Sequence, residues 1–193
     1  MPASARPDPA ELHRRATESF AARVAGVGDD QWGLPTPCSD WDVRALVNHL
    51  VYENRWTAPL VEGATIAEVG DRFEGDLLGD DPKGAWAASA SEATSAVLVP
   101  GAVERTVHLS FGDTPGGEYA MQLAADLLVH GWDLARATGG DEKLDPELVA
   151  AVAAWFEANE SHYRRAGAIA ARPPVPPGAD QQTVLLAAFG RRT

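Results

Sequence analysis

Two short segments of the sequence each place ionisable side chains four residues apart. In "LVNHLVYEN" His49 precedes Glu53, and in "AADLLVHGWD" Asp126 precedes His130. Residues four apart lie one turn apart on the same face of a helix, so a carboxylate and an imidazole at this spacing can hold one cation between them. Two imidazoles and one carboxylate form the ligand set of a catalytic zinc site that keeps a fourth position open for water or substrate. His49, Asp126 and His130 are therefore candidate metal ligands.

Other roles for these side chains fit the same spacing. His49 and His130 can instead be partly buried structural histidines, with ring nitrogens satisfied by neighbouring hydrogen bonds. Asp133 follows His130 by about one turn, where it can accept a hydrogen bond from the ring nitrogen that faces away from a metal, or be an exposed helix acid. Glu53 is a candidate general base beside a metal, but we expect it to be a solvated acid.

The remaining histidines and the single cysteine give weaker signals. His13 in "HRR" and His162 in "SHYRR" lie among charged residues and are expected on solvated faces. His108 falls in an extended segment and is a candidate for a substrate contact at the mouth of a bundle. Cys38 precedes Ser39, the expected N-cap of a helix, where the helix dipole would lower a thiol pKa. No histidine is near Cys38 in the sequence, so we expect a small buried loop residue.

Length and composition limit the class of protein. A chain of 193 residues is long enough to bury a sizeable core, and we expect one domain over residues 1–193. The formal net charge of -12 argues against a nucleic-acid partner. No apolar run approaches the ~20 residues of a membrane span, and no secretory signal precedes the first expected helix. A single cysteine without a disulfide partner favours the cytoplasm.

Helices are the elements that must position the candidate ligands. Caps, breakers and apolar residues three to four apart predict them, whereas alternating strand patterns are almost absent. We expect a mainly all-α fold in which facing helices of a four-helix bundle build the metal site, with an extra helix at the C-terminal end. The expected helices cover residues 8–28, 39–57, 81–100, 115–140, 145–166 and 181–190, and the short extended segment covers 103–111.

Three segments carry a resemblance to a known family. They are "LPTPCSDWDVRALVNHL", "RTVHLSFGDTPGGEYAMQLAADLLVHGWDLARATG" and "LLAAFGRR". They resemble the actinobacterial metal-binding proteins grouped with the N-terminal domain of mycothiol-dependent maleylpyruvate isomerase, in the DinB-like superfamily. The resemblance implies a DinB-like four-helix bundle that holds zinc or nickel. It assigns the ligands to His49, Asp126 and His130, with Asp133 in support.

Two departures from that family bear on the reaction. The carboxylate ligand is Glu in the isomerase, and the shorter Asp126 stands here, so the backbone must approach the metal more closely. The isomerase also carries an additional C-terminal domain that contributes to its active site, and this chain is expected to end too soon to contain it. Maleylpyruvate isomerisation itself is therefore not the expected activity.

The resemblance and the candidate ligands together favour a metal-dependent enzyme. We expect the ion to bind a low-molecular-weight thiol such as mycothiol, lower its pKa, and support S-transfer to or isomerisation of a small molecule. The alternatives are a metal-dependent hydrolase, in which the ion activates water, and a noncatalytic metal-binding or sensing bundle. A monomer and a homodimer are both compatible with such a fold.

Overall fold

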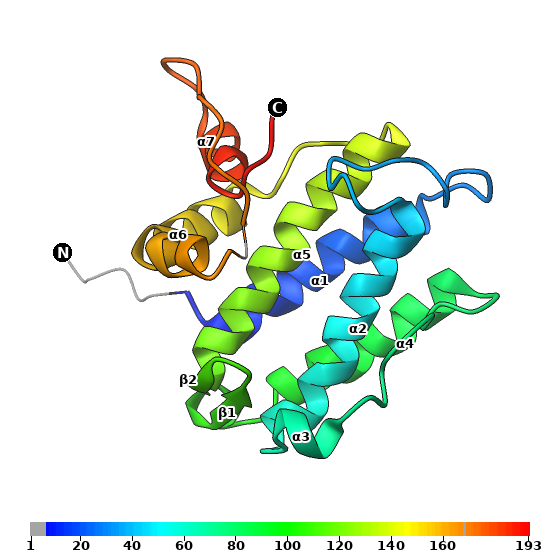
Figure 1. Cartoon of the computed structure of the whole chain (residues 1–193), viewed down its shortest axis with the longest axis vertical. Helices are drawn as coiled ribbons and strands as arrows, with labels where there is room; N and C mark the ends of the chain where they lie inside the picture. Colours follow the sequence, from blue (N-terminus) through cyan, green and yellow to red (C-terminus); the bar gives the residue numbers. More distant parts are fainter. Residues whose placement is uncertain (1–6, 168) are drawn as a thin grey trace. The chain divides into compact units, whose positions relative to one another are not determined.

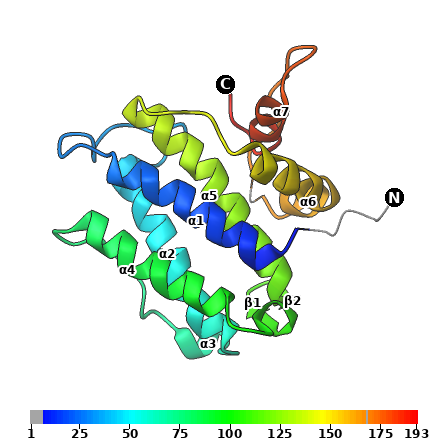
Figure 2. The same cartoon turned by 180° about the vertical axis from the view of Figure 1, so that it is seen from behind.

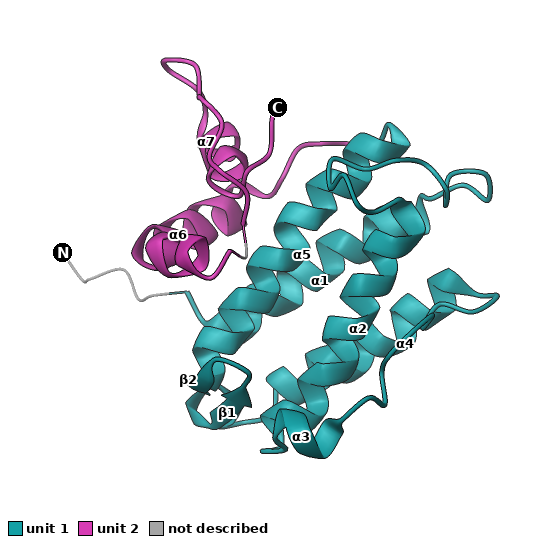
Figure 3. Cartoon of the chain, in the orientation of Figure 1, with its two compact units in different colours: residues 1–140 teal, residues 141–193 magenta. Residues whose placement is uncertain are grey.

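Helices dominate both of the compact units into which the chain divides (Figure 3). The computed structural model describes residues 7–167 and 169–193. The first unit ends at Gly140 and the second begins at Asp141. All candidate metal ligands belong to the first unit, so its architecture decides whether they can meet.

Four long helices form the bundle of the first unit (Figures 1 and 2). They are α1 (Pro9–Ala25), α2 (Val43–Val61), α4 (Pro82–Val97) and α5 (Gly116–Thr138). The helix α1 packs against α4 and α5, and α2 packs against the same two helices. Each bundle helix thus has two neighbours, and α2 faces α5 directly. The mainly helical class and the four-helix bundle predicted from the sequence are confirmed.

The start of α2 differs from the sequence prediction. Asp42, not Ser39, is its N-cap, and the Asp42 side chain accepts a hydrogen bond from the Ala45 backbone. The preceding residues are held in a turn, because the Thr36 backbone N–H and side-chain hydroxyl both donate to the Trp41 carbonyl. The helix also continues past the expected end and includes Pro59.

Short elements connect the bundle helices. After α2 come the one-turn helix α3 (Ile66–Val69) and, beyond α4, the 3-10 helix η1 (Ala102–Glu104). The strands β1 (Thr106–Leu109) and β2 (Gly112–Pro115) pair as an antiparallel hairpin. The sequence predicted extended structure only through 103–111 and did not anticipate α3 or β2. The four residues of α3 are too few to show a helical apolar period, and β2, of sequence GDTP, lacks the apolar alternation of a longer strand.

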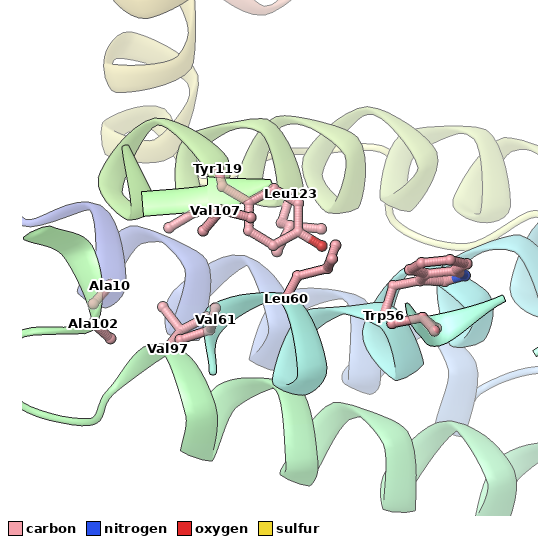
Figure 4. Close-up of a cluster of buried hydrophobic side chains, with 11 residues drawn as sticks. Ala10, Trp56, Leu60, Val61, Val97, Ala102, Val107, Tyr119 and Leu123 are labelled. Atoms are coloured by element: carbon pink, nitrogen blue, oxygen red, sulfur yellow. The ribbon is translucent and has the colours of Figure 1, made fainter. Parts of the chain in front are cut away.

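Apolar side chains from α2, α5 and the hairpin form a core cluster at one end of the bundle (Figure 4). Leu60 lies near the C-terminal end of α2, whereas Tyr119 and Leu123 lie in the first half of α5. Figure 4 shows Tyr119 and Leu123 reaching from α5 toward Leu60. The two helices are therefore antiparallel where they face each other, and residues early in α2 lie opposite residues late in α5.

The second unit consists of α6 (Pro146–Arg165) and α7 (Gln181–Ala188). The rings of Phe156 and Phe189 stack with their centroids 4.1 Å apart. Arg164 donates hydrogen bonds to the Glu160 carboxylate and to the Ala188 carbonyl, which ties α6 to the end of α7. Both helices were predicted from the sequence. Throughout the described ranges, no helix combines the length and the apolarity needed to cross a membrane.

Candidate metal centre

The three predicted ligands meet between α2 and α5. His49 comes from α2, and Asp126 and His130 come from successive turns of α5. His49 Nε2 lies 3.0 Å from Asp126 Oδ2, and His130 Nε2 lies 3.3 Å from Asp126 Oδ1. One ligand atom from each of the three side chains lies within 4.8 Å of the others. His49 and Asp126 are 77 positions apart in the sequence, and the antiparallel packing of the two helices brings them together.

The shorter carboxylate of Asp126 reaches both imidazole rings. Its two oxygens face different histidines, so it can accept a hydrogen bond from each ring when the ring nitrogen carries a proton. The Asp126 side chain is 33% exposed and that of His49 is 24% exposed, whereas that of His130 is 8% exposed. The site is therefore open to small molecules on the Asp126 and His49 side and closed behind His130.

Asp133 fixes the orientation of the His130 ring. Its side chain is fully buried, and Asp133 Oδ2 lies 2.9 Å from His130 Nδ1. A proton on Nδ1 is donated to this carboxylate, which directs Nε2 toward Asp126. The alternative of an exposed helix acid is wrong for Asp133.

Charges in the cluster oppose the effect of burial. Burial favours the neutral form of Asp126, but the charges of His130 and His49 and the hydrogen bonds from both rings outweigh it and hold the Asp126 pKa well below its usual range. Burial would lower the pKa of His130, yet Asp126 and Asp133 raise it well above its ordinary value. The cluster therefore keeps an anionic carboxylate between two imidazoles, where a cation is favoured.

Cys38 is a half-buried loop residue, where a buried one was expected, and it lies beside this cluster although no histidine is near it in the sequence. Its Sγ is 3.6 Å from Asp133 Oδ2 and 3.9 Å from His130 Nδ1, and the thiol can donate to the carboxylate. Cys38, His130 and Asp133 thus form a second group of potential metal ligands. Because Asp42 caps α2, Cys38 is not at the helix N-terminus as predicted. The loop before α2 carries it to α5, over a separation of 92 residues that no local sequence pattern reveals.

Trp41 is a site residue that sequence reasoning missed. Its ring centroid lies 4.6 Å from that of His49 and 5.5 Å from that of His130. The indole packs against the two imidazoles from the loop that precedes α2. The sequence carries no signal for this position, because one tryptophan before a helix is equally expected in a core.

Glu53 connects the cluster with a neighbouring pocket. Burial, followed by the charge of Asp126, raises the pKa of Glu53 to about 7, while His49 and His130 act in the opposite direction. Glu53 also lines a cavity of about 320 Å³ between α2, α3, the hairpin and α5. Glu53 is thus half-buried beside the cavity rather than on a fully solvated face, and a carboxyl group whose pKa lies near neutral pH suits proton transfer.

The other three histidines lie outside the cluster. His13 was expected on a solvated face, but it is fully buried, because it lies on the same face of α1 as Ala16, Thr17 and Phe20. Neither of its ring nitrogens has a hydrogen-bond partner among the described residues, and burial lowers its pKa to about 4.

His108 and His162 are both accessible to solvent. His108 on β1 pairs with Asp113, with 2.7 Å between Nδ1 and Oδ1, and it is not one of the described residues that line the cavity. The predicted substrate contact of His108 therefore has no support from the position of the cavity. His162 is exposed on α6, as expected.

Comparison with known families places most of the bundle in a described domain family. The family described as the mycothiol maleylpyruvate isomerase N-terminal domain has a model that matches residues 13–135. This chain belongs to that family. The matched range begins inside α1, ends inside α5 and contains all three candidate ligands, the Cys38 loop and the cavity.

Relatives within this family are found in mycobacteria. The uncharacterized protein MT0763 of Mycobacterium tuberculosis (strain CDC 1551 / Oshkosh) is 37% identical over 195 residues, which cover 96% of this chain and 98% of the relative. The uncharacterized protein Rv0738 of M. tuberculosis (strain ATCC 25618 / H37Rv) matches with the same identity and coverage. The likeness extends past the family domain into the second unit.

A solved structure shares the fold. The crystal structure of the mycothiol-dependent maleylpyruvate isomerase superimposes with a TM-score of 0.69 at 14% sequence identity, covering 95% of this chain and 88% of that chain. The sequence comparison with the family predicted that a whole C-terminal domain of the isomerase has no counterpart here. Coverage of 88% of the isomerase contradicts that expectation at the level of the fold, because most of its length has a structural equivalent in this chain.

Proposed function

We propose that this chain binds one divalent cation, zinc or nickel, and acts with a low-molecular-weight thiol such as mycothiol in S-transfer to, or isomerisation of, a small molecule. His49, Asp126 and His130 hold the cation, and Asp133 orients His130. The observation that carries the proposal is the convergence of one ligand atom from each of these three side chains within 4.8 Å. The family and its thiol-dependent member in the comparisons support the choice of thiol.

The chemistry of the ligands fits such a cation. Imidazole nitrogens suit zinc and nickel, and one carboxylate completes a set that leaves a position for a further ligand. The hydrogen bond between Asp133 and His130 Nδ1 is the carboxylate support that metal-binding histidines commonly have. The exposed edges of His49 and Asp126 supply the path for a ligand to enter.

Each neighbouring side chain has a defined part in this proposal. A divalent cation at the site lowers the pKa of a coordinated thiol, so that thiolate is available near neutral pH. Glu53 holds or accepts the proton that such a thiol releases, because its pKa near 7 allows both states. Trp41 packs against the two imidazoles from the loop side.

The surroundings of the site favour catalysis over a purely structural ion. A structural metal is enclosed by its ligands, whereas Asp126 is one-third exposed and the cavity begins one helical turn away at Glu53. A lone cysteine, Cys38, agrees with the reducing cytoplasm in which such thiols are kept, and we include that location in the proposal.

Metal content measured by elemental analysis tests the ligand set. The protein is purified without a metal-binding tag and loaded with zinc or nickel, and we expect the native chain to retain one ion. His49→Ala and His130→Ala are expected to retain none, whereas His162→Ala, the matched exposed histidine on α6, retains the ion. A native chain without metal after loading, or an unchanged content in both ligand variants, contradicts the proposal.

The role of the thiol is tested on the loaded protein with candidate electrophiles. Consumption of the electrophile that requires an added low-molecular-weight thiol supports an S-transferase or isomerase activity. Consumption without a thiol supports the hydrolase instead, in which the same ligands serve to activate water.

A further inference from the structure

The cavity beside the metal ligands has no cationic lining. Ten described residues line it, and none of them is Lys, Arg or His. The one ionisable carboxylate, Glu53, is either neutral or negative, so it adds no positive charge in any protonation state. The whole chain carries a formal charge of -12, which adds to the repulsion of anions. Apart from the proposed cation beyond its polar end, an anionic group in this cavity would therefore leave water without a compensating charge, at a high cost.

The polar and apolar parts of the lining are separated along the helices. Glu53 follows His49 by one turn of α2, and Gln122 precedes Asp126 by one turn of α5, so the polar end of the cavity borders the metal ligands. Farther from them, the walls are Leu60 and the aromatic ring of Tyr119, which also belong to the core cluster (Figure 4).

The hairpin closes the far end of the cavity with apolar groups. Leu109 ends β1 and Phe111 lies in the turn that follows; both line the cavity together with Ser110 of the same turn, and Ile66 on α3 also lines it. Phe111 is 59% exposed, the most exposed of the large hydrophobic side chains on the described surface. An exposed aromatic residue at the edge of an apolar cavity gains from covering a bound apolar ligand.

We propose that this cavity binds an uncharged, largely apolar molecule whose single polar end faces Glu53 and Gln122. Resting on the proposed function, the inference is that this molecule is the substrate that accompanies the thiol. A volume of about 320 Å³ admits one small organic molecule, since small-molecule sites span about 300–1,000 Å³. A dicarboxylate such as maleylpyruvate would set at least one carboxylate against these walls, away from the proposed cation, so we expect the substrate of this chain to differ in charge from the one named in the isomerase structure.

Two probes of nearly the same shape but different charge test this inference. Methyl phenyl sulfone is neutral, benzenesulfonate is an anion, and a sulfonate coordinates metals weakly. Dissociation constants are measured by calorimetry at pH 8 on the full chain. We expect the sulfone to bind at least about tenfold more tightly, because the anion lacks a partner in the cavity. Equal or tighter binding of benzenesulfonate, or binding of neither probe at millimolar concentrations, overturns the inference.

Variants of two lining residues locate the binding. Phe111→Ala is expected to raise the dissociation constant of the sulfone about threefold or more. Because Phe111 is exposed, it can be truncated without opening the core. Gln122→Lys is expected to increase the affinity for benzenesulfonate about tenfold, because the lysine supplies the missing positive charge. The matched variant Gln122→Met leaves that affinity unchanged. Unchanged affinities in both Phe111→Ala and Gln122→Lys place the binding elsewhere and overturn the inference.

Metal content of the same samples separates the two proposals. Protein that prefers the sulfone but takes up no zinc or nickel overturns the proposed function and leaves the nature of the cavity standing. Protein that holds one ion but prefers benzenesulfonate overturns the inference about the substrate alone.

Discussion

Two buried histidines on neighbouring helices of the bundle have opposite surroundings. His130 on α5 lies between the carboxylates of Asp126 and Asp133, which raise its pKa well above the ordinary value. His13 on α1 has no hydrogen-bond partner at either ring nitrogen among the described residues, and burial lowers its pKa to about 4. Both side chains are more than nine-tenths buried, so burial by itself does not distinguish them.

The difference lies in the partners. A buried histidine without polar neighbours stays neutral and behaves as a flat core side chain that costs free energy for its two unpaired nitrogens. A buried histidine between two carboxylates is held in one orientation and can bind a proton or a cation. The carboxylates of α5, rather than the degree of burial, therefore mark the functional histidine. Three substitutions test this contrast.

Asp133→Ala removes the buried partner of His130 and is expected to have the largest effect. Breaking a buried pair leaves the other member uncompensated, so the free energy of unfolding should fall by about 3–5 kcal/mol. Metal affinity should fall about 10- to 100-fold, because the ring loses its support. Denaturant unfolding of the metal-free protein and metal titration measure the two effects. Asp133→Asn keeps an acceptor for Nδ1 and should lose less; equal losses in both variants would mean that cavity formation, not the hydrogen bond, explains the result.

His13→Leu tests the opposite environment through pH. Between pH 6.5 and about 4 the unfolded chain binds a proton at His13 that the folded chain does not, so stability falls as the pH is lowered through this window. Proton binding by His13 in the unfolded chain alone lowers the free energy of unfolding of the native protein at pH 5 by about 2 kcal/mol relative to pH 8.

The leucine variant has no histidine at this position and lacks this loss of stability. Between pH 8 and pH 5, its free energy of unfolding should therefore rise relative to that of the native protein by about 2 kcal/mol. His162→Leu on the exposed face of α6 is the control and should show no such shift. A pH-independent difference for His13→Leu would show that His13 is protonated in the folded protein or is accessible to water.

Trp41→Leu removes the aromatic ring that covers His49 and His130 and is expected to have the smallest effect. Contacts between aromatic rings contribute about 0.5–1.5 kcal/mol beyond their buried area, so we expect a loss of about 1 kcal/mol in unfolding free energy. Thermal unfolding measures it. A loss as large as that of Asp133→Ala would mean that ring packing, and not the carboxylates, holds the two imidazoles in place.

The helices could be predicted from local signals because helix ends depend on neighbouring residues. Asp8, Asp81 and Asp145 each precede a proline and cap the helices that the sequence predicted there. Ser39 was a wrong choice of cap because its turn is fixed by hydrogen bonds between Thr36 and Trp41, and such a pairing has no signature in a helix template.

The ligand cluster was predictable only in part. The four-residue spacing of Asp126 and His130 placed them on one face of α5, and the ligand chemistry made His49 of α2 a candidate partner, but only the resemblance to a family favoured one shared site over separate structural histidines. Cys38 and the buried state of His13 were missed, because both depend on which helix packs against which loop or face. Hydrophobic periodicity predicts the buried face of one helix or strand at a time, and it does not predict which elements contact each other.

The indole of Trp41 has a practical consequence. Its ring lies within 6 Å of both imidazoles, and a protonated imidazole or a transition metal at that distance quenches indole fluorescence. The molecule therefore carries an intrinsic optical reporter at its own site. Among the ring contacts of the described residues, the tryptophan against both His49 and His130 is Trp41. Its emission should respond to nickel and to the protonation of His130, and subtracting the spectrum of Trp41→Leu isolates that signal.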